Sequence, residues 1–166
     1  MIIDRDVLLP NWPGLAGRDI AVARAENLST EPVRRVFAWW QAHAGMTPPR
    51  RADFDIIEFA PIAGHLYLID QVAEGFELRL AGEEYIRLFD LKKGWLWRND
   101  AEDPVMRDSA KFLTFTSGLR RPMRTIGRLL LSDRQWVQLE ALVCPLSCED
   151  GSVRQLLGCT AALDAA

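Results

Sequence analysis

Few residues of this sequence have side chains suited to metal or nucleophile chemistry. The 166 residues include two histidines, His43 and His65, and three cysteines. Cys144 and Cys148 are close in sequence, but no second pair completes a tetrahedral zinc site. Cysteine is also a small, soft residue that is common in protein interiors. We therefore expect no metal site, and the odd number of cysteines favours a reducing, cytoplasmic location.

Catalytic machinery is equally scarce. The sequence contains no glycine-rich phosphate loop, no His-Glu-x-x-His helix and no serine elbow. Carboxylate pairs such as Glu83-Glu84 are adjacent, so they do not converge on one point of a helix. Arg79 could hold an acidic ligand, but the alternation of its strand predicts a cross-strand ion pair instead. We expect no catalytic residues and no enzymatic activity.

One charged pattern is similar to the PilZ signature, which binds cyclic dinucleotides. Arg120 and Arg124 are spaced as the arginine pair of that signature, and Asp150 and Ser152 follow in the expected order. Gln155 stands where the signature has glycine. A solvated charge run followed by a hairpin turn is the simpler interpretation.

The composition is that of one soluble globular domain. Hydrophobic residues make up 49% of the chain and charged residues 26%, close to the average for such proteins. The net charge of -3 and the pI near 5.4 argue against nucleic-acid binding. Charges interrupt the N-terminal apolar residues, and no apolar run is long enough for a bilayer. We expect neither a nucleic acid nor a membrane as a partner.

The first 28 residues are expected to form a partly irregular arm. Residues 1–28 mix apolar side chains with proline and glycine and show no sustained hydrophobic period. We expect Trp12 and Leu15 to dock this arm on the domain. Residues 19–27 are predicted to form a short helix.

An amphipathic helix follows the arm. Ser29-Thr30-Glu31-Pro32 supplies the hydroxyl cap, the acid and the early proline that are typical of a helix start. Apolar residues then recur at helical spacing, which predicts a helix over 31–44 that ends before Gly45. Packing on the domain is the simple interpretation of its apolar face, and a dimer contact is the more specific one. The candidate dimer-interface residues are Val36, Trp39 and Trp40.

Residues 29–166, which include this flanking helix, are expected to form one α+β domain. The expected elements are strands over 65–72, 76–80, 123–131, 136–146 and 153–163, short helices over 56–62 and 83–89, and a helix over 104–117 that Gly118 closes. Turns are expected at Glu74-Gly75, Ser132-Asp133 and Glu149-Asp150-Gly151. Hairpin turns require antiparallel pairing, so the segments predict a five-stranded antiparallel sheet with helices on one face.

Short motifs in this order resemble the PAS domain, specifically a bacterial PAS-like family of short stand-alone proteins. The motifs are Pro49-Arg50-Arg51-Ala52-Asp53-Phe54-Asp55, His65-Leu66-Tyr67-Leu68-Ile69-Asp70, Phe76-Glu77-Leu78-Arg79-Leu80-Ala81-Gly82, Cys144-Pro145-Leu146-Ser147, Asp150-Gly151 and Leu156-Leu157-Gly158. Together they cover about residues 33–163. One departure is Asp90, where the family usually has glycine. The resemblance implies the PAS sheet order 2-1-5-4-3, helices on one face and an N-terminal helix.

The resemblance leaves the cofactor unknown. PAS domains bind small molecules between sheet and helices, or they dimerise and transmit a signal through flanking helices. Haem-binding members need an axial histidine on the long helix, and residues 104–117 contain none. Flavin photosensors of this fold need a cysteine in the short-helix segment, and residues 83–103 contain none.

The resemblance also implies a cavity between the sheet and the helices. Large side chains can either wall such a cavity or fill it, and both interpretations stay open at this point. An open cavity would take an apolar or aromatic ligand, with Thr114 among its possible polar contacts. The candidate ligand-binding residues are Tyr67, Tyr85, Phe89, Trp97, Phe112, Phe115, Thr116, Leu129, Leu139 and Leu142.

The sequence therefore predicts a non-enzymatic, cytoplasmic sensory module that acts through protein contacts biased by a small ligand. A ligand shifts such a module only by its different affinities for two arrangements. The movable element would be helix 31–44 or its arm. We expect a homodimer and a separate signalling partner. The alternative is a ligand-free dimerisation module, followed by a cyclic-dinucleotide binder or a small enzyme.

Overall fold

A single antiparallel sheet of seven strands organises the described part of the molecule. The computed structural model describes residues 7–130 and 136–163. Along the sheet the strand order is β1-β5-β6-β7-β2-β3-β4, and every neighbouring pair is antiparallel. The strands are β1 (Asp19–Val22), β2 (Leu66–Val72), β3 (Gly75–Ala81), β4 (Leu96–Arg98), β5 (Met123–Leu130), β6 (Trp136–Ser147) and β7 (Val153–Ala162).

The predicted count of five strands is wrong, because each edge of the sheet gains one short strand. The five predicted strands are neighbours in the succession β3, β2, β7, β6, β5. Beyond them, β4 pairs with β3, and β1 pairs with β5 through Asp19 opposite Ile126. The helix predicted over 19–27 is therefore also wrong. Its first residues bond to the free edge of β5, and only Ala25–Asn27 forms a 3-10 turn.

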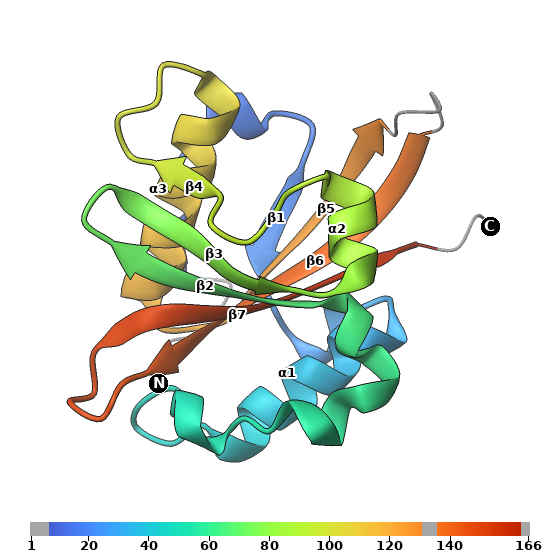
Figure 1. The fold of residues 1–166 in the computed structure, drawn as a ribbon, viewed down its shortest axis with the longest axis vertical. Helices are drawn as coiled ribbons and strands as arrows, with labels where there is room; N and C mark the ends of the chain where they lie inside the picture. The colour runs from blue at the N-terminus through green and yellow to red at the C-terminus, as the bar shows by residue number, and fades with distance from the viewer. Residues whose placement is uncertain (1–6, 131–135, 164–166) are drawn as a thin grey trace.

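Three α-helices and several 3-10 segments complete the fold (Figure 1). The helix α3 begins as its sequence predicts, because the Asp103 carboxylate accepts a hydrogen bond from the Met106 amide at 3.0 Å. It ends at Leu119, where the next residue, Arg120, has a left-handed φ of 61°, and so continues past the predicted end at Gly118. The elements are α1 (Glu31–His43), α2 (Glu83–Phe89), α3 (Pro104–Leu119), and 3-10 segments Pro13–Leu15, Ala25–Asn27, Arg51–Asp53 and Ile56–His65.

Helices cover both faces of the sheet, which corrects the expectation of one covered face. In Figure 1, α1 lies below the sheet, whereas α2 and α3 lie above it. Successive side chains of a strand point to opposite faces of the sheet. Leu142 therefore packs in the hydrophobic cluster with α1, and Val143 packs in the cluster with α3. The central strands are therefore buried on both faces.

The candidate dimer-interface residues belong to the packing of α1 on its own sheet. Val36 is fully buried and Trp39 is 7% exposed. Trp40 is half-buried, and its indole Nε1 donates to the Pro145 carbonyl at 2.8 Å. A dimer contact would require Val36 and Trp39 to lie on the surface. In the structure both are instead buried by their own chain.

The turns between strands agree with the expected positions where they can be compared. Gly151 has a φ of 84°, and the Ser152 amide donates to Asp150 Oδ1 at 3.0 Å. The Ser132-Asp133 turn lies outside the described residues. The N-terminal arm docks as predicted, because Trp12 and Leu15 are both buried.

Candidate functional site

The structure contains a cavity of about 220 Å³ between the sheet, α2, α3 and the N-terminal arm. Its floor comes from β2, β5, β6 and β7, and its walls come from the helices and from Trp97 of β4. Five of the ten candidate ligand-binding residues line it: Tyr67, Tyr85, Phe89, Trp97 and Phe112.

The other five candidates do not line this cavity. Phe115 packs against Trp12 with ring centroids 5.5 Å apart, and Thr116 donates its hydroxyl to the Phe112 carbonyl within α3. Leu142 packs on the opposite, α1 side of the sheet. Leu129 and Leu139 are placed in their strands but are absent from the cavity wall. The Thr114 hydroxyl is likewise used within α3, where it bonds to the Ala110 carbonyl.

Several cavity residues carry no signal that sequence reasoning could use. Leu15 and Arg18 come from the arm, and no local pattern shows that the arm closes a cavity. Thr125 and Thr160 are polar residues inside strands, and only the register between strands places them on the cavity side. The remaining lining residues are Ile69, Leu91, Val105, Ser109, Leu113, Ala141 and Val143.

Three stacked rings form the aromatic wall of the cavity. The ring of Tyr67 stacks on Tyr85 at 4.2 Å between centroids, and Tyr85 packs on Phe89 at 4.7 Å. The first ring comes from β2 and the other two from α2, so the stack joins the sheet to the helix. Such contacts favour flat apolar or aromatic ligands, because a further ring can pack against the same wall.

Burial controls the ionisation of the two tyrosines. It raises the pKa of the Tyr67 phenol well above its ordinary value, and it raises the pKa of Tyr85 in the same way. Both phenols therefore remain neutral hydrogen-bonding groups at physiological pH. The guanidinium of Arg18 lies near enough to lower both pKa values, although burial outweighs it.

One polar atom of the cavity wall is unsatisfied. Thr160 is 1% exposed, and among the described residues its Oγ1 has no hydrogen-bond partner of acceptable geometry. The Thr160 hydroxyl lies near the phenol of Tyr67 and lowers its pKa. Burial of Tyr67 raises the same pKa by more. A buried hydroxyl without a partner is costly, and a ligand with a polar group could satisfy it.

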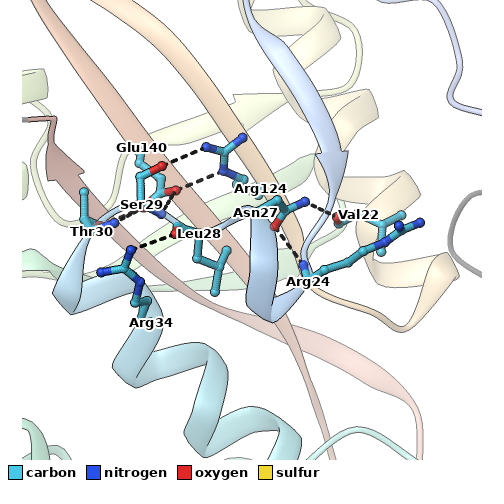
Figure 2. Close-up of polar contacts among 9 residues, drawn as sticks. All are labelled: Val22, Arg24, Asn27, Leu28, Ser29, Thr30, Arg34, Arg124 and Glu140. Carbon is cyan, nitrogen blue, oxygen red and sulfur yellow. Dashed lines mark hydrogen bonds and ion pairs between the residues drawn. The ribbon is translucent and has the colours of Figure 1, made fainter.

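A second polar cluster connects the arm, α1 and the sheet (Figure 2). Glu140 of β6 is fully buried, and its carboxylate accepts from the Ser29 and Thr30 amides, both at 2.8 Å. It also accepts from the Thr30 hydroxyl at 2.7 Å and pairs with Arg124 Nε at 2.9 Å. A carboxylate from the sheet thus caps the start of α1, the flanking helix.

The turn before this cap is also closed by hydrogen bonds. Asn27 Oδ1 accepts from the Arg24 amide at 2.9 Å, and its Nδ2 donates to the Val22 carbonyl at 3.0 Å. Arg34 of α1 reaches back to the Leu28 carbonyl at 3.1 Å. Figure 2 shows these contacts along the segment that connects β1 to α1, beside the Glu140 cluster.

The remaining sequence candidates lie outside the cavity. The predicted ion pair of Arg79 is confirmed, with Asp70 on the neighbouring strand at 3.1 Å. Arg124 pairs with Glu140, whereas Arg120 donates to the Gly151 carbonyl, so the two arginines of the PilZ-like pattern have separate partners. Among the described residues, no group of three or more His, Cys, Asp or Glu side chains could hold a metal ion.

No histidine or cysteine is among the described residues that line the cavity. His65 Nδ1 contacts the backbone carbonyl of Thr160, and His43 stacks on Trp39 at 4.9 Å between centroids. Cys144 and Cys159 are buried on the α1 side of the sheet. Burial raises the pKa of both thiols well above the ordinary value, so they remain protonated.

The sequence matches the family model of the PAS domain over residues 28–161. This match spans most of the chain, so the chain belongs to the PAS domain family, and the expected family is confirmed. PAS domains are sensory and signalling domains. No curated protein matches the chain.

Several solved structures are similar to part of this chain at low sequence identity. The PAS domain of BvgS from Bordetella pertussis is 17% identical, with 68% of this chain and 89% of that chain covered and a TM-score of 0.49. An RNA-binding light-oxygen-voltage receptor is 18% identical, with a TM-score of 0.46. The match covers 69% of this chain but only 36% of that receptor. A LOV protein of Rhodobacter sphaeroides is 17% identical, with 68% and 70% covered and a TM-score of 0.45.

None of the helices in residues 7–130 and 136–163 combines the length and the apolar character that a bilayer crossing requires.

Proposed function

We propose that this PAS domain is a non-enzymatic, cytoplasmic sensory module that binds a small apolar or aromatic molecule in the cavity. The observation that supports this most directly is the aromatic wall around a space of about 220 Å³. An engineered apolar cavity of about 150 Å³ already binds benzene, so this space is sufficient for a small ligand.

The ligand acts by favouring one arrangement of the arm and α1. Leu15 of the arm lines the cavity, and the arm continues through β1 to the capped start of α1. A ligand that contacts the arm therefore has different affinities for docked and undocked arrangements, which is the requirement for a shift between them. A separate partner protein would then recognise the exposed side of α1.

Ligand retention and cavity filling test this function. Native mass spectrometry of gently purified protein is expected to show a bound small molecule, and small aromatic compounds are expected to raise the melting temperature. Ala141→Leu places extra carbons on the cavity floor and should abolish that thermal shift. Ala52→Leu, at an exposed position away from the cavity, is the control and should retain it. No retained molecule and no thermal shift with wild-type protein would reject the proposal.

We also propose that the module is a homodimer. PAS domains often dimerise, but Val36 and Trp39 are buried within one chain, so Trp40 is the candidate with free surface. Light scattering should give twice the mass of one chain, and Trp40→Ala should lower it. A monomeric wild-type mass would remove the dimer from the proposal.

A further inference from the structure

The charges around the cavity are unbalanced. Sixteen of the described residues line it, and only one of these sixteen, Arg18, is charged. No aspartate or glutamate is among them. Across the described part of the chain, no carboxylate forms an ion pair with Arg18, although other arginines such as Arg79 and Arg124 have such partners.

We propose that the ligand carries a carboxylate on an aromatic or apolar body, and that Arg18 binds this carboxylate at the mouth of the cavity. The inference rests on the proposed ligand-binding function and defines the chemical class of the ligand. Arg18 lies outside residues 28–161, so the family match does not account for it. A guanidinium presents paired N–H donors that fit a carboxylate in a bidentate manner.

The side chain of Arg18 is exposed, and its aliphatic part lies against the bare backbone of Gly127. A Cβ atom at position 127 would lie 3.0 Å from Arg18 Cγ and 3.7 Å from its Cβ and Cδ. The aliphatic part of Arg18 therefore lies across β5, beside Thr125 in the cavity floor. Arg18 lines the same cavity as Tyr67 and Tyr85, and its positive charge lowers the pKa of both phenols, although burial raises them by more.

The arm that carries Arg18 is firmly docked. The Gly14 amide donates to the buried Asp108 carboxylate of α3 at 2.6 Å. Trp12 packs edge-on against Phe112 and Phe115, with centroids 5.7 and 5.5 Å away. The four residues from Asp19 then pair with β5, so Arg18 is fixed on both sides in sequence. An arginine on an anchored backbone loses less entropy when it binds an anion than one on a free arm.

The hydroxyl groups of the wall are a further feature that suits a polar ligand group. The unpartnered Oγ1 of Thr160 is buried in the wall, and the neutral phenols of Tyr67 and Tyr85 lie near it. Hydroxyls can donate to carboxylate oxygens as well as accept. The cavity therefore offers one cation, several hydroxyls and an aromatic wall.

The volume and the single charge limit the size of this ligand. A space of about 220 Å³ lies below the range of about 300–1,000 Å³ that is typical for drug-sized ligands. One ring with a short acidic group fits this space, whereas a nucleotide does not. Because the described residues place no second basic side chain in the lining, a monoanionic carboxylate matches the charge of the cavity better than a phosphate dianion.

The test compares benzoate with benzamide, its neutral isostere, by calorimetry on the full chain. Benzoate is expected to bind the wild-type protein about tenfold more tightly than benzamide, because hydrogen bonds to charged groups exceed neutral ones by about this factor. In Arg18→Gln this preference should disappear while benzamide affinity is retained. Phenyl phosphate should bind more weakly than benzoate.

A matched control separates a local contact from general charge. Arg128→Gln removes the same charge from the neighbouring groove, which Arg18 also borders, but Arg128 does not line the cavity. It should leave the tenfold preference unchanged. Equal affinities of benzoate and benzamide, tighter binding of phenyl phosphate, or an equal loss in both variants would overturn the carboxylate inference and leave the cavity function standing. Failure of both probes to bind the wild-type protein would overturn both.

Discussion

The ring of Tyr67 lies directly across the backbone of Gly158. The two residues face each other in the pairing of β2 with β7, and a Cβ at position 158 would lie 2.0 Å from Cε2 and Cζ of the ring. A side chain at this position and the present tyrosine orientation therefore exclude each other. The bare backbone of β7 allows Tyr67 to lie flat, stack on Tyr85 and form the cavity wall.

Gly158→Ala should destabilise the protein by about 1–3 kcal/mol, the usual cost of overpacking a core. Alanine within a strand otherwise improves stability over glycine, so the sign of the effect identifies the clash. Urea unfolding measures it. Gly45→Ala is the control, since nothing lies within 4 Å of a Cβ there. Equal unfolding midpoints for the two variants would contradict the proposed clash.

Glu140→Gln should cost about 3–5 kcal/mol of unfolding free energy. The change leaves Arg124 without its charge partner and turns an amide group toward the Ser29 and Thr30 donors. A double-mutant cycle with Arg124→Gln, followed by urea unfolding, isolates the coupling between the two side chains. Glu31→Gln, exposed at the same helix start, should change stability by less than about 0.5 kcal/mol. A similarly small effect at Glu140 would show that the cap contributes little.

Stability should fall at alkaline pH. Burial raises the folded-state pKa of Tyr67, so above the ordinary tyrosine pKa of about 10 the unfolded chain loses a proton that the folded chain keeps. Each such group lowers the unfolding free energy by about 1.4 kcal/mol per pH unit in that range. Cys144 and Cys159 contribute in the same direction, starting above the ordinary thiol pKa.

Tyr67→Phe removes one of these contributions. Its unfolding free energy, measured by urea titration from neutral pH to about pH 11, should decline less steeply above pH 10 than that of the wild-type protein. An unchanged slope would mean that Tyr67 titrates normally and is not buried as described.

Asp108→Ala should release the arm from α3. The change leaves the Gly14 amide without its acceptor, which costs about 1–3 kcal/mol, and this cost falls on local opening of the arm. Limited trypsin digestion should then cleave after Arg18 or Arg24 at least about tenfold faster than in the wild-type protein. Asp100→Ala, at an exposed loop position, is the control. Equal cleavage rates in both variants would show that the arm is held by other contacts.

Local sequence patterns were sufficient to predict the central helices and hairpins. The helix α3 follows from the Asp103 cap, and the β2–β3 hairpin follows from a Gly75 turn between apolar segments. These predictions succeeded because capping and turn formation depend on residues close in sequence. The helix predicted over 19–27 failed because the edge of β5 supplied hydrogen-bond partners about a hundred residues away.

Some residues of the candidate cavity could be predicted from the sequence, and others could not. Tyr67, Tyr85 and Phe89 could be named because large aromatic residues on expected elements are natural cavity walls. Leu142 was misplaced, because a strand buried on both faces shows no alternation that distinguishes one side from the other. The position of Thr160 in the cavity wall could not be predicted from the sequence, because only the register of β7 on β6 places it on the cavity side of the sheet.

The amino-acid order by itself determined the family, the central hairpins, the flanking helix and most of the aromatic wall, because caps, turns and periodicity are encoded within a few residues. Only the tertiary structure decided which face each central strand residue serves, that both faces are covered, and that the arm brings Arg18 to the cavity. These features depend on contacts between segments far apart in the chain, whose free energy no local pattern records.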